Sequence, residues 1–142
     1  MKVLKIHTLE KGWFDKDYVM LHAVFQLLVD FVEHEKPDQI VDWNSDLKHK
    51  HAWKEICSLY RWWTQKRQSR KSPLDEKGLK RPPMKLKKIQ GTENRQLVDY
   101  DKNRYAAYDD ALKKHWRLEK KWYEEDQRNL HRLIEIRQFL WT

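Results

Sequence analysis

Residues that form turns are scarce in this chain and are gathered mainly in one stretch. The 142 residues include three glycines and four prolines, and Pro73, Gly78, Pro82 and Pro83 all lie between positions 73 and 83. A fold of many short strands needs many turns, so this composition disfavours an all-β protein and favours long helices. Eight Trp, six Tyr and four Phe supply apolar surface for one hydrophobic core. We therefore expect a mainly α protein that forms a single helical domain over residues 1–142.

Hydrophobic periodicity predicts three helices. Residues 15–35 are apolar around most of the helical circumference and are followed by Pro37, which ends the first helix. A second helix is expected to begin at Asn44 or Ser45, and a third to run from about 103 to 139. Residues 2–8 are expected to form a short extended segment, an edge strand paired with residues 39–43. The predicted architecture is two shorter helices packed on a long C-terminal helix.

The apolar positions of these helices also predict the core. We further expect Trp141, in the terminal Leu-Trp-Thr, to fill part of it. The predicted core residues are Leu21, Phe25, Leu28, Val32, Trp53, Ile56, Tyr60, Trp116, Leu130 and Leu133.

The positive charge is concentrated in one segment. Residues 66–88 contain ten Lys or Arg against Asp75 and Glu76, which accounts for the formal net charge of +8 and leaves the remainder balanced. Proline and glycine in the same segment disfavour regular structure, so residues 66–104 are predicted to be a basic, Pro-containing connector. Such a concentration of charge favours a polyanionic partner, either nucleic acid or an acidic protein surface.

Two adjacent tryptophans precede this basic segment. On an α-helix, Trp62 and Trp63 point about 100° apart, so we expect the Trp62 ring to stay exposed and to stack on a base of a single strand. The alternative is that both rings pack, with the cations solvated or paired with acids of the third helix. The predicted polyanion site comprises Arg61, Trp62, Lys66, Arg67, Arg70, Lys71, Lys80, Arg81, Lys85, Lys87 and Lys88.

A line of polar residues follows one side of the first predicted helix. The line consists of His22, Gln26, Asp30 and Glu33, which recur at helical spacing. It is either an internal polar site suited to acid–base or metal chemistry or a solvent-exposed edge of the helix. Charged residues, Glu119, Asp126 and Arg137, also interrupt the apolar stripe of the third helix. We expect them to form structural pairs, Asp30 with Arg137 or Asp126 with His22. A metal-assisted hydrolase using His22, Asp30, Glu33 and Asp126 remains an alternative.

Other chemistries have little support in the sequence. Cys57 is the sole cysteine, which rules out an intramolecular disulfide and fits a reducing compartment. The motifs GxSxG and HExxH are absent, and no glycine-rich loop is present to bind phosphate. We expect no cofactor, no bound metal and no membrane span, in a soluble cytoplasmic protein. Two sets of possible metal ligands have unsuitable spacing: Asp46, His49 and His51, and Glu124, His131 and Glu135.

Both ends of the chain resemble a group of small uncharacterised proteins encoded by tailed bacteriophages. The resemblance rests on IHTLEKGWFDKDYVMLHAVFQLLVDFVE (6–33), HAWKEICSLYRWW (51–63) and EEDQRNLHRLIEIRQFLWT (124–142). It implies expression in the cytoplasm of an infected bacterium but no activity, ligand or catalytic residue. The favoured function is an accessory protein that binds nucleic acid or its associated machinery. An inhibitor or adaptor of a host protein is the alternative, and the identity of the partner and the oligomeric state stay open.

Overall fold

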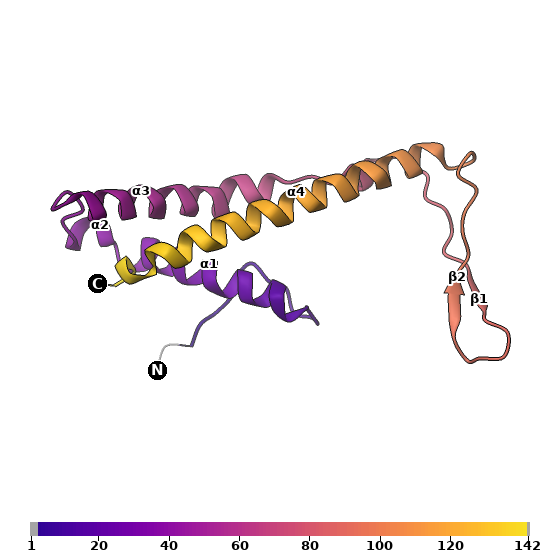
Figure 1. Ribbon diagram of the computed structural model, residues 1–142, viewed down its shortest axis with the longest axis horizontal. Helices are drawn as coiled ribbons and strands as arrows, with labels where there is room; N and C mark the ends of the chain where they lie inside the picture. The colour runs from indigo at the N-terminus through magenta and orange to yellow at the C-terminus, as the bar shows by residue number, and fades with distance from the viewer. Residues whose placement is uncertain (1–2, 142) are drawn as a thin grey trace. The chain divides into compact units, whose positions relative to one another are not determined.

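The computed structural model describes residues 3–141, which divide into two compact units. Unit 1 consists of residues up to Arg70 together with those from Glu124 onward, and unit 2 of residues 71–123. The long helix α4 (Ala106–Ile136) contributes residues to both units. The protein is mainly helical, with shorter helices packed against this C-terminal helix, so the predicted fold class is confirmed (Figure 1).

Unit 1 contains α1 (Lys16–His34), α2 (Pro37–Ile40) and α3 (Leu47–Arg61), with the C-terminal part of α4. The helix α3 continues into a π-helical turn, η1 (Trp62–Lys66), and a 3-10 turn, η2 (Arg67–Ser69). A further 3-10 turn, η4 (Arg137–Phe139), follows α4. No helix within residues 3–141 is both long enough and apolar enough to cross a membrane.

Local sequence explains where the unit 1 helices begin and end. Lys36 adopts a left-handed conformation with φ 48°, and Pro37 follows as the first residue of α2, so α1 cannot continue. Asp46 caps α3 by accepting a hydrogen bond from the His49 backbone N–H at 2.8 Å. The observed bounds of α1 and α3 agree with the predicted helices to within a few residues.

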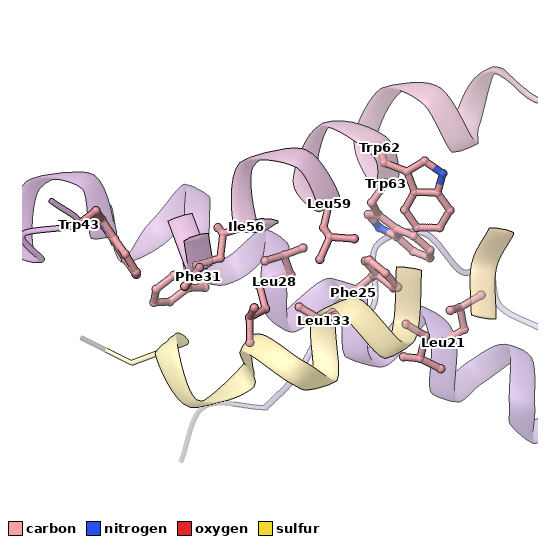
Figure 2. Packing of buried hydrophobic residues seen from close by; sticks show 13 residues of the cluster. Leu21, Phe25, Leu28, Phe31, Trp43, Ile56, Leu59, Trp62, Trp63 and Leu133 are labelled. Carbon is pink, nitrogen blue, oxygen red and sulfur yellow. The ribbon is translucent and has the colours of Figure 1, made fainter. Parts of the chain in front are cut away.

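The hydrophobic core of unit 1 is formed by α1, α3, η1 and the end of α4 (Figure 2). The Trp43 indole joins this core and donates a hydrogen bond to the Pro37 carbonyl at 3.0 Å. Of the predicted core, Leu21, Phe25, Leu28, Ile56, Leu130 and Leu133 are buried, and Val32, Trp53 and Tyr60 pack against them half-buried.

Two tryptophans predicted to lie in the core are exposed instead. The Trp116 side chain is 58% exposed, because it lies on the unit 2 part of α4, outside the residues that form the core. Trp141 is 61% exposed, whereas the two residues before it, Phe139 and Leu140, pack against the core. Thr142, the last residue of that predicted docking end, lies outside the described residues.

The predicted N-terminal strand does not form. Residues 3–6 belong to no helix or strand, and residues 37–40 form α2 rather than a partner strand; Lys2 lies outside the described residues. The N-terminal segment instead covers polar side chains of α1. The His7 backbone N–H donates to Gln26 Oε1 at 3.1 Å, and Thr8 Oγ1 lies 2.6 Å from His22 Nδ1.

Unit 2 contains a hairpin where the sequence predicted irregular structure. A 3-10 turn, η3 (Pro73–Asp75), precedes the antiparallel strands β1 (Leu86–Lys88) and β2 (Arg95–Leu97). Gly91 supplies the positive φ, +81°, at the third position of a turn closed by the Thr92 N–H on the Ile89 carbonyl. The basic connector is therefore partly ordered as a β-ribbon.

Candidate nucleic-acid interface

Trp62, predicted to be the exposed stacking platform, is buried. Its side chain is 6% exposed and that of Trp63 is 2% exposed. The Trp63 ring stacks on Phe25 with centroids 4.5 Å apart, and the Trp62 ring contacts the same phenylalanine at 5.2 Å. The prediction of a Trp62 platform is therefore wrong, because both rings belong to the core (Figure 2).

The first arginines of the basic segment form ion pairs with α4. Arg67 donates from Nε and Nη2 to the two oxygens of Asp126, at 3.2 and 3.1 Å. Arg70 Nη2 lies 2.7 Å from Glu125 Oε2 and 2.8 Å from Asp126 Oδ1. Both arginine side chains are about 15% exposed and lie over aromatic rings, Arg67 over Trp63 and Arg70 over Trp62. They act in the fold and are poorly placed to meet a phosphate chain.

The neighbouring cations stabilise the charged form of the Glu125 carboxylate. Burial by itself would raise the pKa of Glu125, but the hydrogen bond and charge of Arg70 hold that pKa below its usual value. The charge of the Lys66 ammonium acts in the same direction. Lys66 is more loosely held, since its Nζ lies 3.5 Å from Glu125 Oε1 and its side chain is 75% exposed. The predicted site thus divides: Trp62, Arg67 and Arg70 are structural, whereas Lys66 stays accessible.

The hairpin and the segment leading to it form a run of exposed cations within unit 2. Residues 77–98 contain seven Lys or Arg and a single acid, Glu93. Lys88 Nζ lies 3.0 Å from Glu93 Oε1, but both side chains are exposed, so this pair contributes little. Arg81 donates to the Leu74 carbonyl, which leaves its charge unneutralised. The exposed cations of residues 77–98 are Lys77, Lys80, Arg81, Lys85, Lys87, Lys88 and Arg95.

The strand register places cations on both faces of the ribbon. Lys88 pairs with Arg95 and Leu86 with Leu97, so these four side chains share one face. Lys87, paired with Gln96, lies on the opposite face. Every strand residue is exposed, and no third strand pairs with β1 or β2 within residues 3–141. The ribbon therefore presents positive charge on both of its sides.

A tyrosine fixes the base of the hairpin to α4 within unit 2. Tyr100, shortly after β2, donates its hydroxyl to Asp109 Oδ1 at 2.9 Å, and Lys113 Nζ lies 2.6 Å from the other oxygen of Asp109. Burial and the Asp109 hydrogen bond raise the pKa of Tyr100 to about 12, so the hydroxyl stays protonated and continues to donate. The Tyr100 ring also makes edge contacts with Tyr105 and Tyr108.

The polar line of α1 is half buried. His22 and Gln26 are each 3% exposed, whereas Glu33 lies in solvent. Gln26 donates to Asp30 Oδ1 at 2.9 Å, and the Tyr60 hydroxyl donates to Glu33 Oε1 at 2.7 Å. The line is therefore neither a wholly internal site nor a wholly exposed edge.

The four side chains of the hydrolase alternative are held apart by different partners. His22 binds Thr8, Asp30 binds Gln26, Glu33 binds Tyr60, and Asp126 binds two arginines. The predicted pair of Asp126 with His22 is wrong, because Asp126 acts on His22 only through its charge. The predicted pair of Asp30 with Arg137 is also wrong, because Asp30 Oδ1 lies 3.7 Å from His34 Nδ1 instead. Within residues 3–141, no group of three His, Cys, Asp or Glu side chains is arranged to hold a metal ion.

The exposed cationic surface agrees only in part with the predicted site. The predicted cations that are exposed are Arg61, Lys66, Lys71, Lys80, Arg81, Lys85, Lys87 and Lys88. Lys77 and Arg95 were not included in the site. The signal that could have added Arg95 is Gly91, because a glycine favours a turn there, and the resulting hairpin places Arg95 opposite Lys88.

Comparisons of the chain with models of protein families, with curated proteins and with solved structures found no match.

Proposed function

We propose that this protein binds duplex nucleic acid through the cationic hairpin of unit 2. The observation that carries the proposal is a ribbon with Lys87 on one face and Lys88 and Arg95 on the other, all exposed. A two-stranded β-ribbon fits the major groove of B-form DNA, where cations on both faces can approach the phosphates of both walls. The major groove of an RNA helix is too narrow for this, so DNA is the favoured duplex.

Burial of Trp62 changes the mode of binding that the sequence suggested. Recognition of single strands relies on exposed aromatic rings that stack with bases, and Trp62 cannot supply one. The exposed cations remain, and a phosphate-directed mode depends on charge rather than on stacking. The resemblance of both chain ends to small phage-encoded proteins supports an accessory role in an infected bacterium.

A salt titration tests the proposal. Binding of a fluorescent 20-base-pair duplex is measured by anisotropy between 50 and 200 mM salt, for the wild type and for K85Q/K87Q/K88Q. If six phosphates are neutralised, affinity falls about 10³-fold over this range, and removing three contacts lowers the slope by about 2.7. The matched control, K48Q/K50Q/K54Q, removes three exposed lysines of α3 in unit 1 and should leave the slope unchanged. Equal slopes for the wild type and the hairpin variant would refute the proposal.

A host protein is the second candidate partner, because the ribbon also exposes apolar side chains. Met84 is 82% exposed, Leu86 55% and Leu97 64%, and the two leucines lie opposite each other on one face. An acidic protein surface with an apolar centre would match this face. Pull-down from infected lysate with and without nuclease separates the candidates. Recovery of nucleic acid that is lost after nuclease treatment supports duplex binding, whereas nuclease-resistant recovery of one host protein supports the second candidate.

A further inference from the structure

Unit 1 contains an open cavity between the end of α3, the turns η1 and η2, and α4. Its volume is about 700 Å³, within the range of small-molecule sites. Four of its lining side chains are cationic, namely Arg61, Lys66, Arg128 and Arg132. The carboxylate that lines it, Glu125, is already engaged by Arg70 and Lys66. The cavity is therefore positively charged.

Arg132 is held by its own network and is not available to a ligand. Its Nε and Nη2 donate to the two oxygens of Glu55 at 2.7 and 3.0 Å, which lowers the pKa of Glu55. Its Nη1 donates to Asn129 Oδ1 at 2.7 Å, and its Nη2 also donates to Ser58 Oγ at 3.1 Å. This network fixes one wall of the cavity.

Two other arginines lining the cavity have unused donors. Arg61, on α3, donates from Nε to the Cys57 carbonyl at 3.3 Å, and its Nη groups have no partner within residues 3–141. Arg128, on α4, is exposed and makes no hydrogen bond or ion pair with any described residue. Planar guanidinium groups bind phosphate through paired N–H donors, and here two helices bring two of them to one cavity. Lys66, whose side chain is 75% exposed, adds a third positive charge.

We infer that this cavity binds a phosphate group, with Arg61 and Arg128 as its principal ligands. The Trp62 ring lines the wall but is 6% exposed, so recognition rests on charge and hydrogen bonding rather than on stacking with an aromatic ligand. The bound group is thus a compact phosphate, carried by a small molecule or by a nucleic-acid backbone. The site lies in unit 1 and does not depend on the hairpin of unit 2.

Isothermal titration with inorganic pyrophosphate at constant ionic strength tests the site. R61Q and R128Q should each weaken binding at least about tenfold, because each removes charge-assisted hydrogen bonds. R61K and R128K keep the charge but lose the planar fork, so they should show an intermediate loss. The control R117Q removes an exposed arginine of α4 in unit 2 and should leave the affinity unchanged.

A second series distinguishes the two sources of phosphate and separates this site from the hairpin. The hairpin variant K85Q/K87Q/K88Q should bind pyrophosphate like the wild type, so failure of the duplex proposal would leave this one standing. A single-stranded 12-mer is then titrated into that variant with and without R61Q/R128Q. Loss of 12-mer affinity identifies a nucleic-acid phosphate as the ligand, and loss of pyrophosphate affinity alone identifies a small molecule. The inference is overturned if R61Q and R128Q bind both probes as R117Q does.

Discussion

At the scale of single residues, the main departure from the prediction is that Trp62 and Trp63 are both buried. The 100° separation of neighbours holds for an α-helix, but Trp62 begins a π-helical turn. Hydrogen bonds from i to i+5 place more residues in each turn, so consecutive side chains point in more similar directions. Both rings thereby reach Phe25 on α1. The sequence shows two adjacent tryptophans but does not show that a π-helical turn begins at Trp62.

Replacing Trp62 by Ala tests its structural role. Removal of a buried tryptophan should lower the free energy of unfolding by about 3–5 kcal/mol, measured by urea denaturation. Trp13 is 84% exposed, so W13A should change the same quantity by no more than about 0.5 kcal/mol. Equal effects of the two substitutions would contradict the burial of Trp62.

His22 makes the stability of unit 1 dependent on pH. Burial, assisted by the charge of Arg67 and opposed by Asp126, lowers the pKa of His22 from 6.5 to about 4. Between these pH values His22 binds a proton in the unfolded chain but not in the folded one. Its contribution to the free energy of unfolding is therefore complete above pH 6.5 and falls as pH approaches 4, by up to about 3 kcal/mol. Urea denaturation from pH 7 to 4 should show a shallower fall for H22F than for the wild type. H131F, at an exposed position, should retain the wild-type slope.

At the scale of elements, ion pairs fix α4 to the turn η2 and to Arg70 directly after it, and the sequence does not specify which residues pair. Arg67 and Asp126 are 59 residues apart, and Arg70 and Glu125 are 55 apart, so helical spacing does not relate them. The sequence placed Asp126 on the apolar stripe of the third helix and predicted that it needs a partner. The sequence contains many cations that could pair with Asp126, so only the tertiary structure identifies Arg67 and Arg70 as its partners.

Asp126→Asn tests this connection. The substitution leaves Arg67 and part of the Arg70 charge uncompensated at positions about 15% exposed, so the free energy of unfolding should fall by about 3 kcal/mol. Glu124 is the neighbouring exposed carboxylate, and E124Q should change stability by less than about 0.5 kcal/mol in the same urea titration. A neutral effect of D126N would show that the ion pairs do not hold α4.

The hairpin depends on its turn, because a two-stranded ribbon alone is marginally stable in water. Gly91 has φ +81°, and an added methyl group would meet no atom within 4 Å, so G91A introduces backbone strain without a clash. We expect about 1 kcal/mol of destabilisation, seen as roughly fivefold faster amide hydrogen exchange in β1 and β2. Gly12 lacks a positive φ, and G12A should leave hairpin exchange unchanged. Unaltered exchange in G91A would contradict the turn.

At the scale of the whole molecule, the spacing of apolar residues along the sequence predicts the features that depend on nearby residues. The helices and most of the unit 1 core followed from apolar spacing, because a buried helical face repeats every three or four residues. The hairpin was missed because prolines and lysines dominate its flanks and its leucines pair only across the turn. Of the cations predicted as a polyanion site, Arg67 and Arg70 form ion pairs in unit 1, whereas Arg61 in unit 1 and the lysines of the hairpin in unit 2 are exposed.

The most direct test of duplex binding is amide hydrogen exchange of the whole protein with and without a 20-base-pair DNA. We predict slower exchange in Leu86–Lys88 and Arg95–Leu97 when the duplex is present, because groove binding stabilises a ribbon that otherwise opens readily. The core helices α1 and α3 should exchange at the same rates in both samples. Unchanged exchange in the two strands at a duplex concentration that saturates binding would contradict the hairpin as the nucleic-acid interface.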